Sequence, residues 1–397
     1  MIRHALRLIW NRKRSNALIL MEIFLSFLVV FVVATLGIFY WDNYRRPLGY
    51  DYRDVWGLEV DLRGEAEKGA GFQESEIFER LLREIGSLAP VEAVGAGFSV
   101  PYENSTQTES SDESGRLLTY EVNPVTEGIG GVLKIETVRG RWFEPGDAAL
   151  AWIPVVIDED LAHAWFGSAD PVGRTFRKAT ANAKERRVIG VVRDFRRSGE
   201  LSATSNYLLE LWRPTAREAT LRNILIRLRP GTPAAFEQEL LTRLRGVARD
   251  ADFEVRTLAQ RREESFRSRL VPLVIGLVVA AFLLLMVGLG LVGVLWQNLI
   301  RRTREVGLRR AAGASRAGVR GQILIEQLLI STLGIALAMI LALQLPLFGV
   351  TRFVSPEVLA AGLLAAALTI YLLTTVCALY PSWMASRLPP AEALRYE

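Results

Sequence analysis

Four apolar stretches of the chain are long enough to cross a membrane as helices. A helix needs about 20 mostly apolar residues to span the hydrocarbon core of a bilayer. The stretches cover residues 17–40, 270–297, 322–345 and 358–381. The first is too long for the apolar part of a signal peptide, and no small-residue cleavage pattern follows it. The pattern therefore predicts four transmembrane helices.

Small residues form a stripe in each of the last two predicted spans. In each span three of them recur at every fourth position: Gly334, Ala338 and Ala342, and then Ala361, Ala365 and Thr369. Such stripes let helix backbones approach closely. We expect both stripes to lie in helix–helix contacts, either within one subunit or across a dimer.

The long segment between the first and second spans carries a strand–helix–strand pattern at each end. Alternating apolar residues predict strands near residues 58–62 and 224–228. A helix follows each strand, with apolar positions spaced +4, +4 and +3: Ile77, Leu81, Ile85 and Leu88, and then Phe236, Leu240, Leu244 and Val247. Thr232 is the expected N-cap and Pro233 the first residue of the second helix. Further strands are predicted at 91–100 and 253–257. We expect the two halves, about 52–100 and 220–258, to fold as one subdomain.

The stretch between these halves, about 101–214, is expected to form a second subdomain. Short apolar runs predict strands at 155–157 and 188–192 with a short helix between them, whereas the polar run 104–115 predicts a mobile loop. His163 lies in that short helix and is interpreted as a packing or surface residue. Together the two parts predict an α+β domain over residues 41–269, inserted between the first two membrane helices.

Residues 258–269 are charged and favour a helix that enters the second span without a glycine. We therefore expect a continuous stalk that carries motion between the domain and the membrane. Its predicted transmission residues are Arg267, Arg269 and Pro272, and the proline is a candidate for a local kink.

Basic clusters beside the spans predict the orientation of the chain. The net charge is +5, and among the short segments that flank the spans, residues 1–16 and 298–321 are rich in arginine. Short loops rich in Lys and Arg stay in the cytoplasm, so both termini are expected there, with residues 1–16 as a basic amphipathic helix and 382–397 as a tail. The domain and the loop 346–357 are then outside. Positive charge beside apolar runs indicates a lipid bilayer as partner, not nucleic acid. Whether orientation is the whole explanation of the first cluster is left open by the sequence.

The composition excludes several kinds of chemistry. The chain has one cysteine, Cys377, and two histidines, His4 and His163, so neither a disulfide framework nor a Cys/His metal site is expected. No lysine stands in a GxxxxGK[ST] phosphate-binding motif. We therefore predict no catalytic residue, no metal and no bound cofactor in this chain, and expect ATP to be bound by a separate subunit.

The second basic cluster has features that orientation alone does not require. Residues 303–314 favour a helix with a basic side and an apolar side, punctuated by Gly307 and Gly313. A short basic amphipathic helix at a membrane surface suits either anionic lipid or an acidic groove on a partner protein.

Several runs resemble one known family, the permeases of ABC-type transporters with a MacB-type periplasmic core domain and an FtsX-like membrane domain. The runs are VVIDEDLAHAWFGSADPVGRTF at 155–176, VIGVVRDF at 188–195, RTREVGLRRAAGAS at 302–315 and AEALRYE at 391–397. They come in the family's order over nearly the whole chain.

The resemblance implies a homodimer or a pair of homologous permeases in the bacterial cytoplasmic membrane. It implies that a short cytoplasmic helix docks on a separate ABC ATPase subunit. It also implies that the halves near the membrane form a porter-like subdomain. The matching ATPase-coupling residues are Arg304, Glu305, Val306, Gly307, Leu308, Arg309, Arg310, Gly313 and Ala314.

Two functions follow from the resemblance, and both are kept as hypotheses. The first is a permease subunit that exports or extracts a peptide, lipoprotein or amphiphile, driven by ATP hydrolysis in its partner. The second is an FtsX-like regulator that activates an extracytoplasmic cell-wall hydrolase or senses peptides. A periplasmic adaptor or a hydrolase is accordingly a candidate partner. No convergent set of nucleophile, base or metal ligands favours a membrane enzyme.

Overall fold

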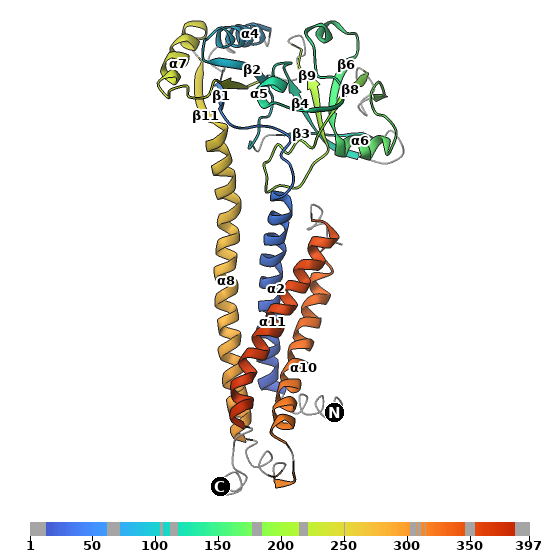
Figure 1. The fold of residues 1–397 in the computed structure, drawn as a ribbon, viewed down its shortest axis with the longest axis vertical. Coiled ribbons are helices and arrows are strands. Elements are labelled where there is room, and N and C mark those ends of the chain that lie inside the picture. Colours follow the sequence, from blue (N-terminus) through green and yellow to red (C-terminus); the bar gives the residue numbers. More distant parts are fainter. Residues whose placement is uncertain are drawn as a thin grey trace. The chain divides into compact units, whose positions relative to one another are not determined.

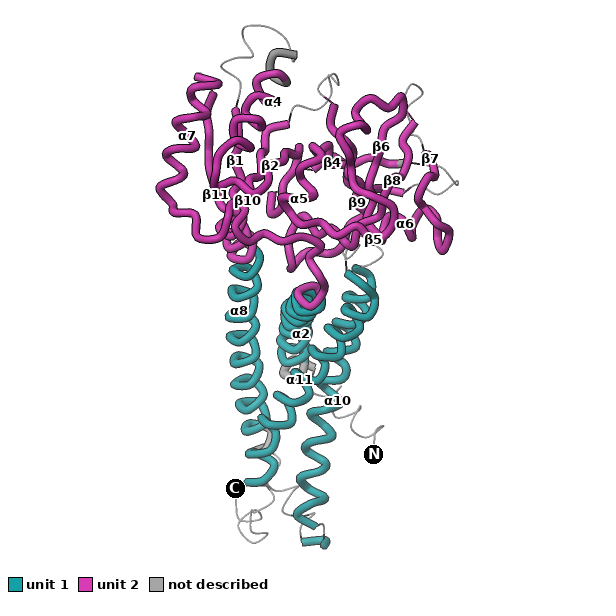
Figure 2. The backbone as a smooth tube through the Cα atoms, turned by 45° about the horizontal axis from the view of Figure 1, so that its top comes forward, with its two compact units in different colours: residues 1–42, 269–397 teal, residues 43–268 magenta. Residues whose placement is uncertain are grey.

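The computed structural model describes most of the chain as two compact units. The described residues are 13–61, 72–103, 106–111, 118–176, 185–213, 221–249, 251–301, 308, 311–313, 315–345 and 354–385. Unit 1 comprises Met1–Asp42 and Arg269–Glu397, and unit 2 comprises Asn43–Ser268 (Figure 2). Most of the predicted segments 1–16, 346–357 and 382–397 lies outside the described residues.

Four helices of the described residues are long and apolar enough to cross a membrane. They are α2 (Lys13–Tyr44), α8 (Leu258–Arg301), α10 (Arg316–Ala342) and α11 (Pro356–Ala385) (Figure 1). Three of them lie wholly or almost wholly in unit 1, whereas α8 has residues in both units. Phe27, Ile335 and Ile370 are among the side chains buried where these helices face one another. The chain is therefore a multi-pass membrane protein.

Small residues mediate the closest helix contacts of unit 1. A Cβ atom added at Gly334 would lie 2.8 Å from Cγ2 of Ile23, so the first predicted stripe faces α2 within the same chain. The second stripe is displaced by one position. Ala361 and its two partners are only half-buried, whereas Gly362 is buried, and a Cβ there would collide with Oγ1 of Thr35. One residue corresponds to about 100° of helix rotation, so the contact within this chain uses a neighbouring face of α11, and a contact of the predicted stripe across a dimer stays a prediction.

Unit 2 is built on one sheet, to which eleven strands of the described residues belong. Its order is β11-β1-β10-β2-β4-β9-β6-β8-β5, with β3 paired to β4 and β7 to β8. The strands are β1 (Val55–Asp61), β2 (Val91–Gly97), β3 (Gln107–Ser111), β4 (Leu118–Val125), β5 (Thr137–Gly140), β6 (Ile153–Asp158), β7 (Thr175–Phe176), β8 (Arg186–Val192), β9 (Tyr207–Leu211), β10 (Asn223–Leu228) and β11 (Asp252–Thr257).

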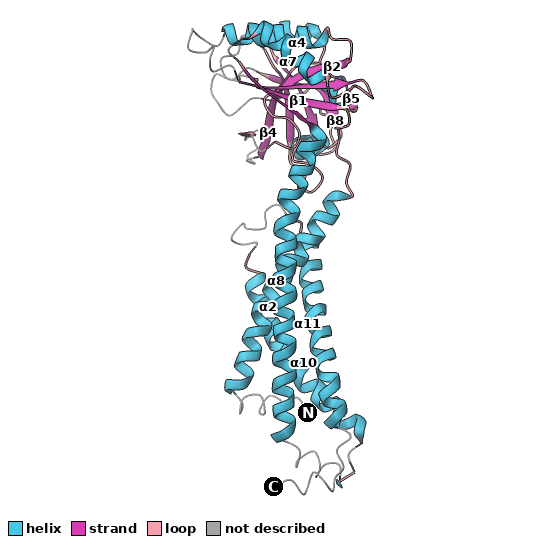
Figure 3. Cartoon of the chain, turned by 90° about the vertical axis from the view of Figure 1, so that its left-hand side faces the viewer, coloured by secondary structure: helices cyan, strands magenta, loops and turns pink. Residues whose placement is uncertain are grey.

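The first four strands of this order are antiparallel and lie beneath two helices. In register, Leu58 of β1 faces Ile224 of β10, which faces Ala96 of β2. Helices α4 (Phe72–Gly86) and α7 (Phe236–Val247) lie on one face of these strands (Figure 3). Their apolar sides pack onto the strands because the predicted +4, +4, +3 positions fall on one side of a helix. The two strand–helix–strand patterns, far apart in sequence, thus share one hydrophobic core.

The start of α7 differs from the prediction. The helix begins at Phe236, and Thr232 does not cap it, because its hydroxyl donates to the carbonyl of Arg229 at 2.7 Å. Pro233 therefore lies in a turn before the helix, where the amide of Phe236 bonds to its carbonyl at 3.0 Å.

The remaining strands include one that the sequence did not predict. Residues 107–111, expected in a mobile loop, form the edge strand β3 along β4. Charge anchors it: the Glu109 carboxylate accepts from the guanidinium of Arg186 at 2.6 Å, although Arg186 lies 77 residues away. Polar composition alone did not reveal this, because the partner comes from a distant strand. Strands β2 and β4 are paired in register at one residue pair, Gly97 with Val125. Beyond β4 the sheet continues through β9, β6, β8 and β5.

Three short helices complete the described part of unit 2. They are α5 (Ile129–Leu133), the 3-10 helix η1 (Pro145–Ala149) and α6 (Glu159–Phe166). Asp158 caps α6 by accepting from the amide of Leu161 at 2.9 Å. This carboxyl is almost completely buried, and burial raises its pKa well above the usual value, although backbone hydrogen bonds oppose the shift. His163 is exposed on the same helix.

Replacing Asp158 should change how stability depends on pH. A raised pKa means that the folded state holds the proton more tightly, so wild-type stability falls as the pH rises from the ordinary aspartate pKa of about 4 towards the folded value. Asp158→Asn keeps the cap and removes the charge. We expect it to be more stable than the wild type at neutral pH, with the difference closing as the pH falls towards about 4, in thermal unfolding of the full chain in detergent.

Asp158→Ala is the control, since it removes the charge and the cap together. It should be less stable than Asp158→Asn by about 1 kcal/mol at every pH. A pH-independent difference between wild type and Asp158→Asn would contradict the burial argument.

Candidate functional site

The predicted ATPase-coupling segment is described at only a few positions. Leu308 is exposed, and Gly313 has a positive φ of 96°, a conformation that favours glycine. Ser315 then caps α10, since its hydroxyl oxygen accepts from the amide of Gly318 at 3.1 Å. The other predicted coupling residues lie outside the described residues: Arg304, Glu305, Val306, Gly307, Arg309, Arg310 and Ala314. Their role stays a prediction.

The predicted stalk residues all lie on helix α8. This helix runs without a break for 44 residues, and Pro272 lies inside it. The proline therefore does not end the helix. Arg267 and Pro272 are exposed, and Arg269 is half-buried. These three side chains do not form a cluster. A role in transmission would therefore depend on the continuous helix that carries them.

A reciprocal capping box fixes the start of α8 immediately after β11. The Gln260 side-chain oxygen accepts from the amide of Thr257 at 2.9 Å, and the Thr257 hydroxyl oxygen accepts from the amide of Gln260 at 3.1 Å. These bonds satisfy donors that a helix start leaves without partners inside the helix. Leu258, between them, is completely buried in the core of unit 2. The first turn of the stalk is thus anchored to the domain.

A buried arginine, Arg196, lies beside this anchored turn. It follows β8 and is only 2% exposed. One terminal nitrogen donates to the carbonyl of Asn43 at 2.6 Å and to that of Arg46 at 3.3 Å. The other donates to the carbonyls of Glu200 at 2.7 Å and Ser202 at 2.5 Å. One guanidinium therefore holds the end of α2 and the loop after β8 together within unit 2.

The backbone around Arg196 approaches the segment that follows α2. Gly49 has a φ of 85°, and any Cβ there would collide with the carbonyl of Asp194. The amide of Arg196 donates to the Leu48 carbonyl at 3.1 Å, and the Tyr50 hydroxyl donates to the Arg196 carbonyl at 3.3 Å. A glycine is required at position 49 for this approach.

The same loop contacts the stalk through an ion pair. Glu200 accepts from Nε of Arg262 at 2.6 Å and from the Tyr102 hydroxyl at 3.3 Å. The Arg262 guanidinium also lies over the rings of Tyr52, at 4.9 Å, and Phe266, at 4.5 Å. We call this set the Arg196 junction: segment 43–52, loop 193–202 and the first turns of α8.

Burial sets the electrostatics of the junction. It lowers the pKa of Arg196, and the charge of Arg46 adds to this effect, but an arginine remains charged at neutral pH. Burial alone would lower the pKa of Arg262, yet the hydrogen bond and charge of Glu200 outweigh it and raise that pKa. Burial also raises the pKa of Tyr50 well above its usual value, which keeps its hydroxyl a neutral donor.

The junction joins its three segments through hydrogen bonds and one ion pair. No cluster of three potential metal ligands occurs among the described residues. The junction joins the chain leaving α2 to the chain entering α8. Sequence analysis missed it because an arginine in a loop is ordinarily solvated. The capping box Thr257–Gln260, by contrast, was a readable signal.

Removing the Arg196 guanidinium should destabilise unit 2. In Arg196→Met the carbonyls of Asn43, Glu200 and Ser202 lose a buried donor, at about 1 kcal/mol or more each, so we expect a loss of about 3 kcal/mol. Urea unfolding of the full chain in detergent would measure it. The matched control is Arg193→Met, in the same loop, where the side chain is 51% exposed and its pair with Glu136 spans 3.9 Å. It should change stability by less than about 0.5 kcal/mol; equal losses in the two variants would contradict the assignment.

Two profiles of known protein families match this chain, one over its N-terminal part and one over its C-terminal part. The profile of the MacB-like periplasmic core domain matches residues 29–243, and that of the FtsX-like permease C-terminal domain matches residues 277–390. The chain is 28% identical over 314 residues to a macrolide export ATP-binding/permease protein MacB of Bordetella avium, covering 75% of this chain and 47% of the relative. It is 26% identical over 406 residues to the protein of that name in Agrobacterium fabrum, covering 97% of this chain and 59% of the relative.

A solved structure also aligns with the sheet domain, at low similarity. The periplasmic region of MacB from Actinobacillus actinomycetemcomitans matches with 15% identity and a TM-score of 0.39, covering 54% of this chain and 94% of that one. A likeness of that size carries no argument. The chain spans about half the length of the curated relatives it matches. On the two profile matches, which together cover most of its residues, the chain belongs to the ABC transporter permeases with a MacB-like periplasmic core domain and an FtsX-like permease domain.

Proposed function

We propose that this chain couples ATP hydrolysis in a separate ATPase subunit to movement of its sheet domain, and so exports or extracts a peptide, lipoprotein or amphiphile. The names of the relatives combine ATP binding, permease and macrolide export, and a macrolide is an amphiphile. The sequence itself has no phosphate-binding motif, so the ATP of the proposed cycle is bound outside these residues. We further propose that two such permeases pair, as the family resemblance implies.

The proposed location is the cytoplasmic membrane, with both termini and residues 298–321 inside and residues 41–269 outside. The arginines beside the first and third spans support this orientation. The two halves 52–100 and 220–258 then form a porter-like subdomain beside the membrane, and residues 101–214 form a second one. The shared core of the strands β11, β1, β10 and β2 supports the first of these subdomains.

The observation that carries the proposal is the uninterrupted helix α8. It starts at a capping box on β11 and ends at Arg301, next to the predicted docking segment. A helix resists bending and twisting because each turn is hydrogen-bonded to the next. No flexible linker interrupts the helix, so movement of its inner end is transmitted to the Arg196 junction. At the junction, the ion pair between Arg262 and Glu200 transmits this movement to loop 193–202. The same loop is bonded through Arg196 to the end of α2.

The predicted docking segment, residues 303–314, is the proposed other end of the pathway. Basic and apolar sides favour an acidic groove on the ATPase. Replacing Arg304 or Arg309 by Glu would place like charges against that groove, and like-charge contacts across an interface are costly.

Charge reversal in this segment should abolish ATPase recruitment. We expect Arg304→Glu together with Arg309→Glu to lower the amount of ATPase that co-purifies with the tagged chain by about tenfold or more, while the chain still inserts in the membrane. Arg12→Ala is the control, because it removes a basic residue from the first cluster only. Unchanged recruitment in the double variant would overturn the docking assignment.

Interrupting α8 should separate ATP turnover from external function. Inserting Gly-Gly after Ser268 adds a flexible point and rotates the two parts of the helix by about 200°. We expect the purified complex to keep its ATPase activity and lose substrate export, measured as release in reconstituted vesicles or as drug tolerance in cells. The same insertion after Gly231, in a turn where a Cβ would meet no atom within 4 Å, should leave export intact. Normal export in the Ser268 variant would exclude transmission through α8.

A further inference from the structure

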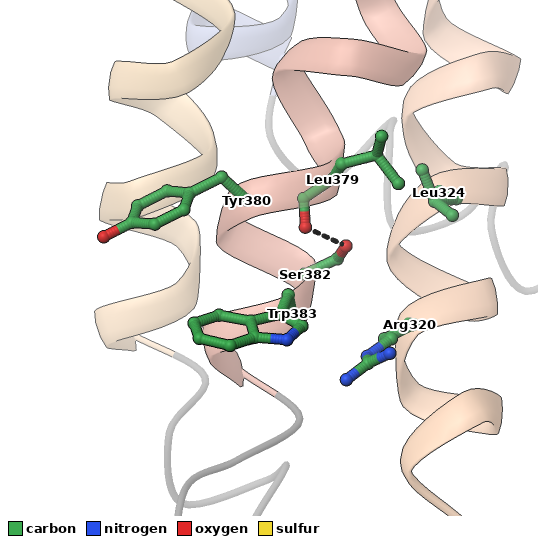
Figure 4. Close-up of a pocket in the computed structure, with 6 residues that line it drawn as sticks. All are labelled: Arg320, Leu324, Leu379, Tyr380, Ser382 and Trp383. Atoms are coloured by element: carbon green, nitrogen blue, oxygen red, sulfur yellow. Dashed lines mark hydrogen bonds between the residues drawn. The ribbon is translucent and has the colours of Figure 1, made fainter.

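The polar groups of the groove between α10 and α11 in unit 1 already have partners. Ser382 is buried there, and its hydroxyl donates to the Leu379 carbonyl at 2.9 Å (Figure 4). Arg320 and Trp383, which also line the groove, take part in interactions as well. The buried polar atom of this groove is therefore not available to a ligand.

Two buried hydroxyls of unit 2, by contrast, have no hydrogen-bond partner among the described residues. They are Oγ of Ser99, which follows β2, and the hydroxyl of Tyr207 in β9. Ser99 is 4% exposed and Tyr207 1%. Nearly all buried polar groups in proteins bond to the protein or to an ordered water, because an unpaired one costs free energy. The two hydroxyls therefore need a partner.

Asn123 of β4 relates the two hydroxyls to each other. Its side-chain oxygen accepts from the amide of Ser99 at 3.0 Å, and its side-chain nitrogen donates to the Ser99 carbonyl at 2.8 Å. Strands β4 and β9 are parallel, with Glu121 opposite Tyr207 and Asn123 opposite Leu209. Side chains two positions apart point to the same face of a strand, so Asn123 and Tyr207 share one face of the sheet.

The neighbouring polar side chains affect Tyr207 without bonding to it directly. Burial raises the pKa of the Tyr207 hydroxyl, and the charge of Arg197 opposes this shift, as do the side chains of Asn123 and Ser99. Both side chains therefore lie near the hydroxyl, although neither bonds to it with normal geometry. Polar groups that face one another beyond direct contact are commonly bridged by a water.

We propose that one buried water molecule is bound at this place by Ser99 Oγ, the Tyr207 hydroxyl and the Asn123 amide. A buried water typically makes about three hydrogen bonds. This one accepts from the Tyr207 hydroxyl and from the second N–H of the Asn123 amide, and it donates to Ser99 Oγ. The first N–H of that amide is already used by the Ser99 carbonyl.

A neutral ligand fits this site, whereas a cation does not. The Arg197 side chain is buried, and its Nε donates to the Glu121 carboxylate at 3.0 Å. Its positive charge also lowers the pKa of Tyr207. A cation bound at the same hydroxyl would be repelled by this guanidinium, but a water carries no net charge.

The site lies where the two parts of the sheet meet. Ser99 comes two residues after Gly97, the residue of β2 that pairs with Val125 of β4. Bonds through an ordered water are nearly as favourable in enthalpy as direct ones. The water therefore adds a polar link between β2 and the strands β4 and β9.

A structure of the full chain in a lipid nanodisc, at a resolution that shows ordered water, tests the site directly. We expect a density peak within hydrogen-bond distance of both Ser99 Oγ and the Tyr207 hydroxyl. A direct bond between the two hydroxyls would overturn the proposal, and so would separated hydroxyls with no peak between them.

A double-mutant cycle tests whether the two hydroxyls share one partner. Ser99→Ala and Tyr207→Phe should each raise the equilibrium constant of unfolding about fivefold, the effect of one hydrogen bond, in urea unfolding of the full chain in detergent. The double variant should fall short of the product of the two effects, about 25-fold, because both changes disturb the same water. The full product, or a single variant as stable as the wild type, would refute the shared water.

Tyr44→Phe is the matched control. Tyr44 is 52% exposed, and its ring lies edge-on against Phe266 with centroids 6.3 Å apart, a contact that phenylalanine keeps. The unfolding constant should change by less than about twofold. Equal effects of Tyr44→Phe and Tyr207→Phe would contradict the site. These readouts involve no ATPase and no export, so this proposal can fail while the transmission proposal stands.

Discussion

The buried guanidinium of Arg196 is the constraint on which the rest of unit 2 depends. Its terminal N–H groups donate to backbone carbonyls from two separate segments of the described residues. A buried charge left without such partners is costly, so the end of α2 and the loop after β8 must stay together. Glu200 extends the constraint to the stalk, because the residue whose carbonyl accepts from Arg196 also binds Arg262 through its carboxylate.

The helices and strands were largely readable because burial imposes a period on the sequence. Four apolar runs predicted four apolar helices, and the spacing of Leu81 and Leu240 with their neighbours predicted the buried sides of α4 and α7. The local sequence was therefore enough to predict these helices and their buried sides. The second small-residue stripe lies one position from the residue that contacts α2 in this chain, since α11 is apolar all round and the choice of face depends on Thr35 in another helix.

The features that sequence reasoning missed depend on partners distant in the chain. Strand β3 is polar and looked like a loop, but Glu109 finds Arg186 across the sheet. Arg196 was not singled out from the sequence, yet carbonyls at Asn43 and Ser202 accept its hydrogen bonds. Neither partner is visible in a local window. The predicted coupling residues are a different case, since most of them lie outside the described residues and their assignment rests on the family resemblance.

The single pairing of Gly97 with Val125 has a mechanical consequence. This pair is the one register pair between β2 and β4, and hydrogen bonds on either side extend the join: the amide of Phe98 donates to the carbonyl of Pro124 at 2.9 Å, and the amide of Thr126 donates to the carbonyl of Ala96 at 2.8 Å. Beneath it, Val55 and Leu225 share a hydrophobic core with Val156 and Tyr207 from the other part. Apolar packing is not directional, so it tolerates small tilts that a ladder would oppose. The two parts of the sheet are therefore joined by a short ladder and a shared apolar core, so any bending between them would be concentrated at this join.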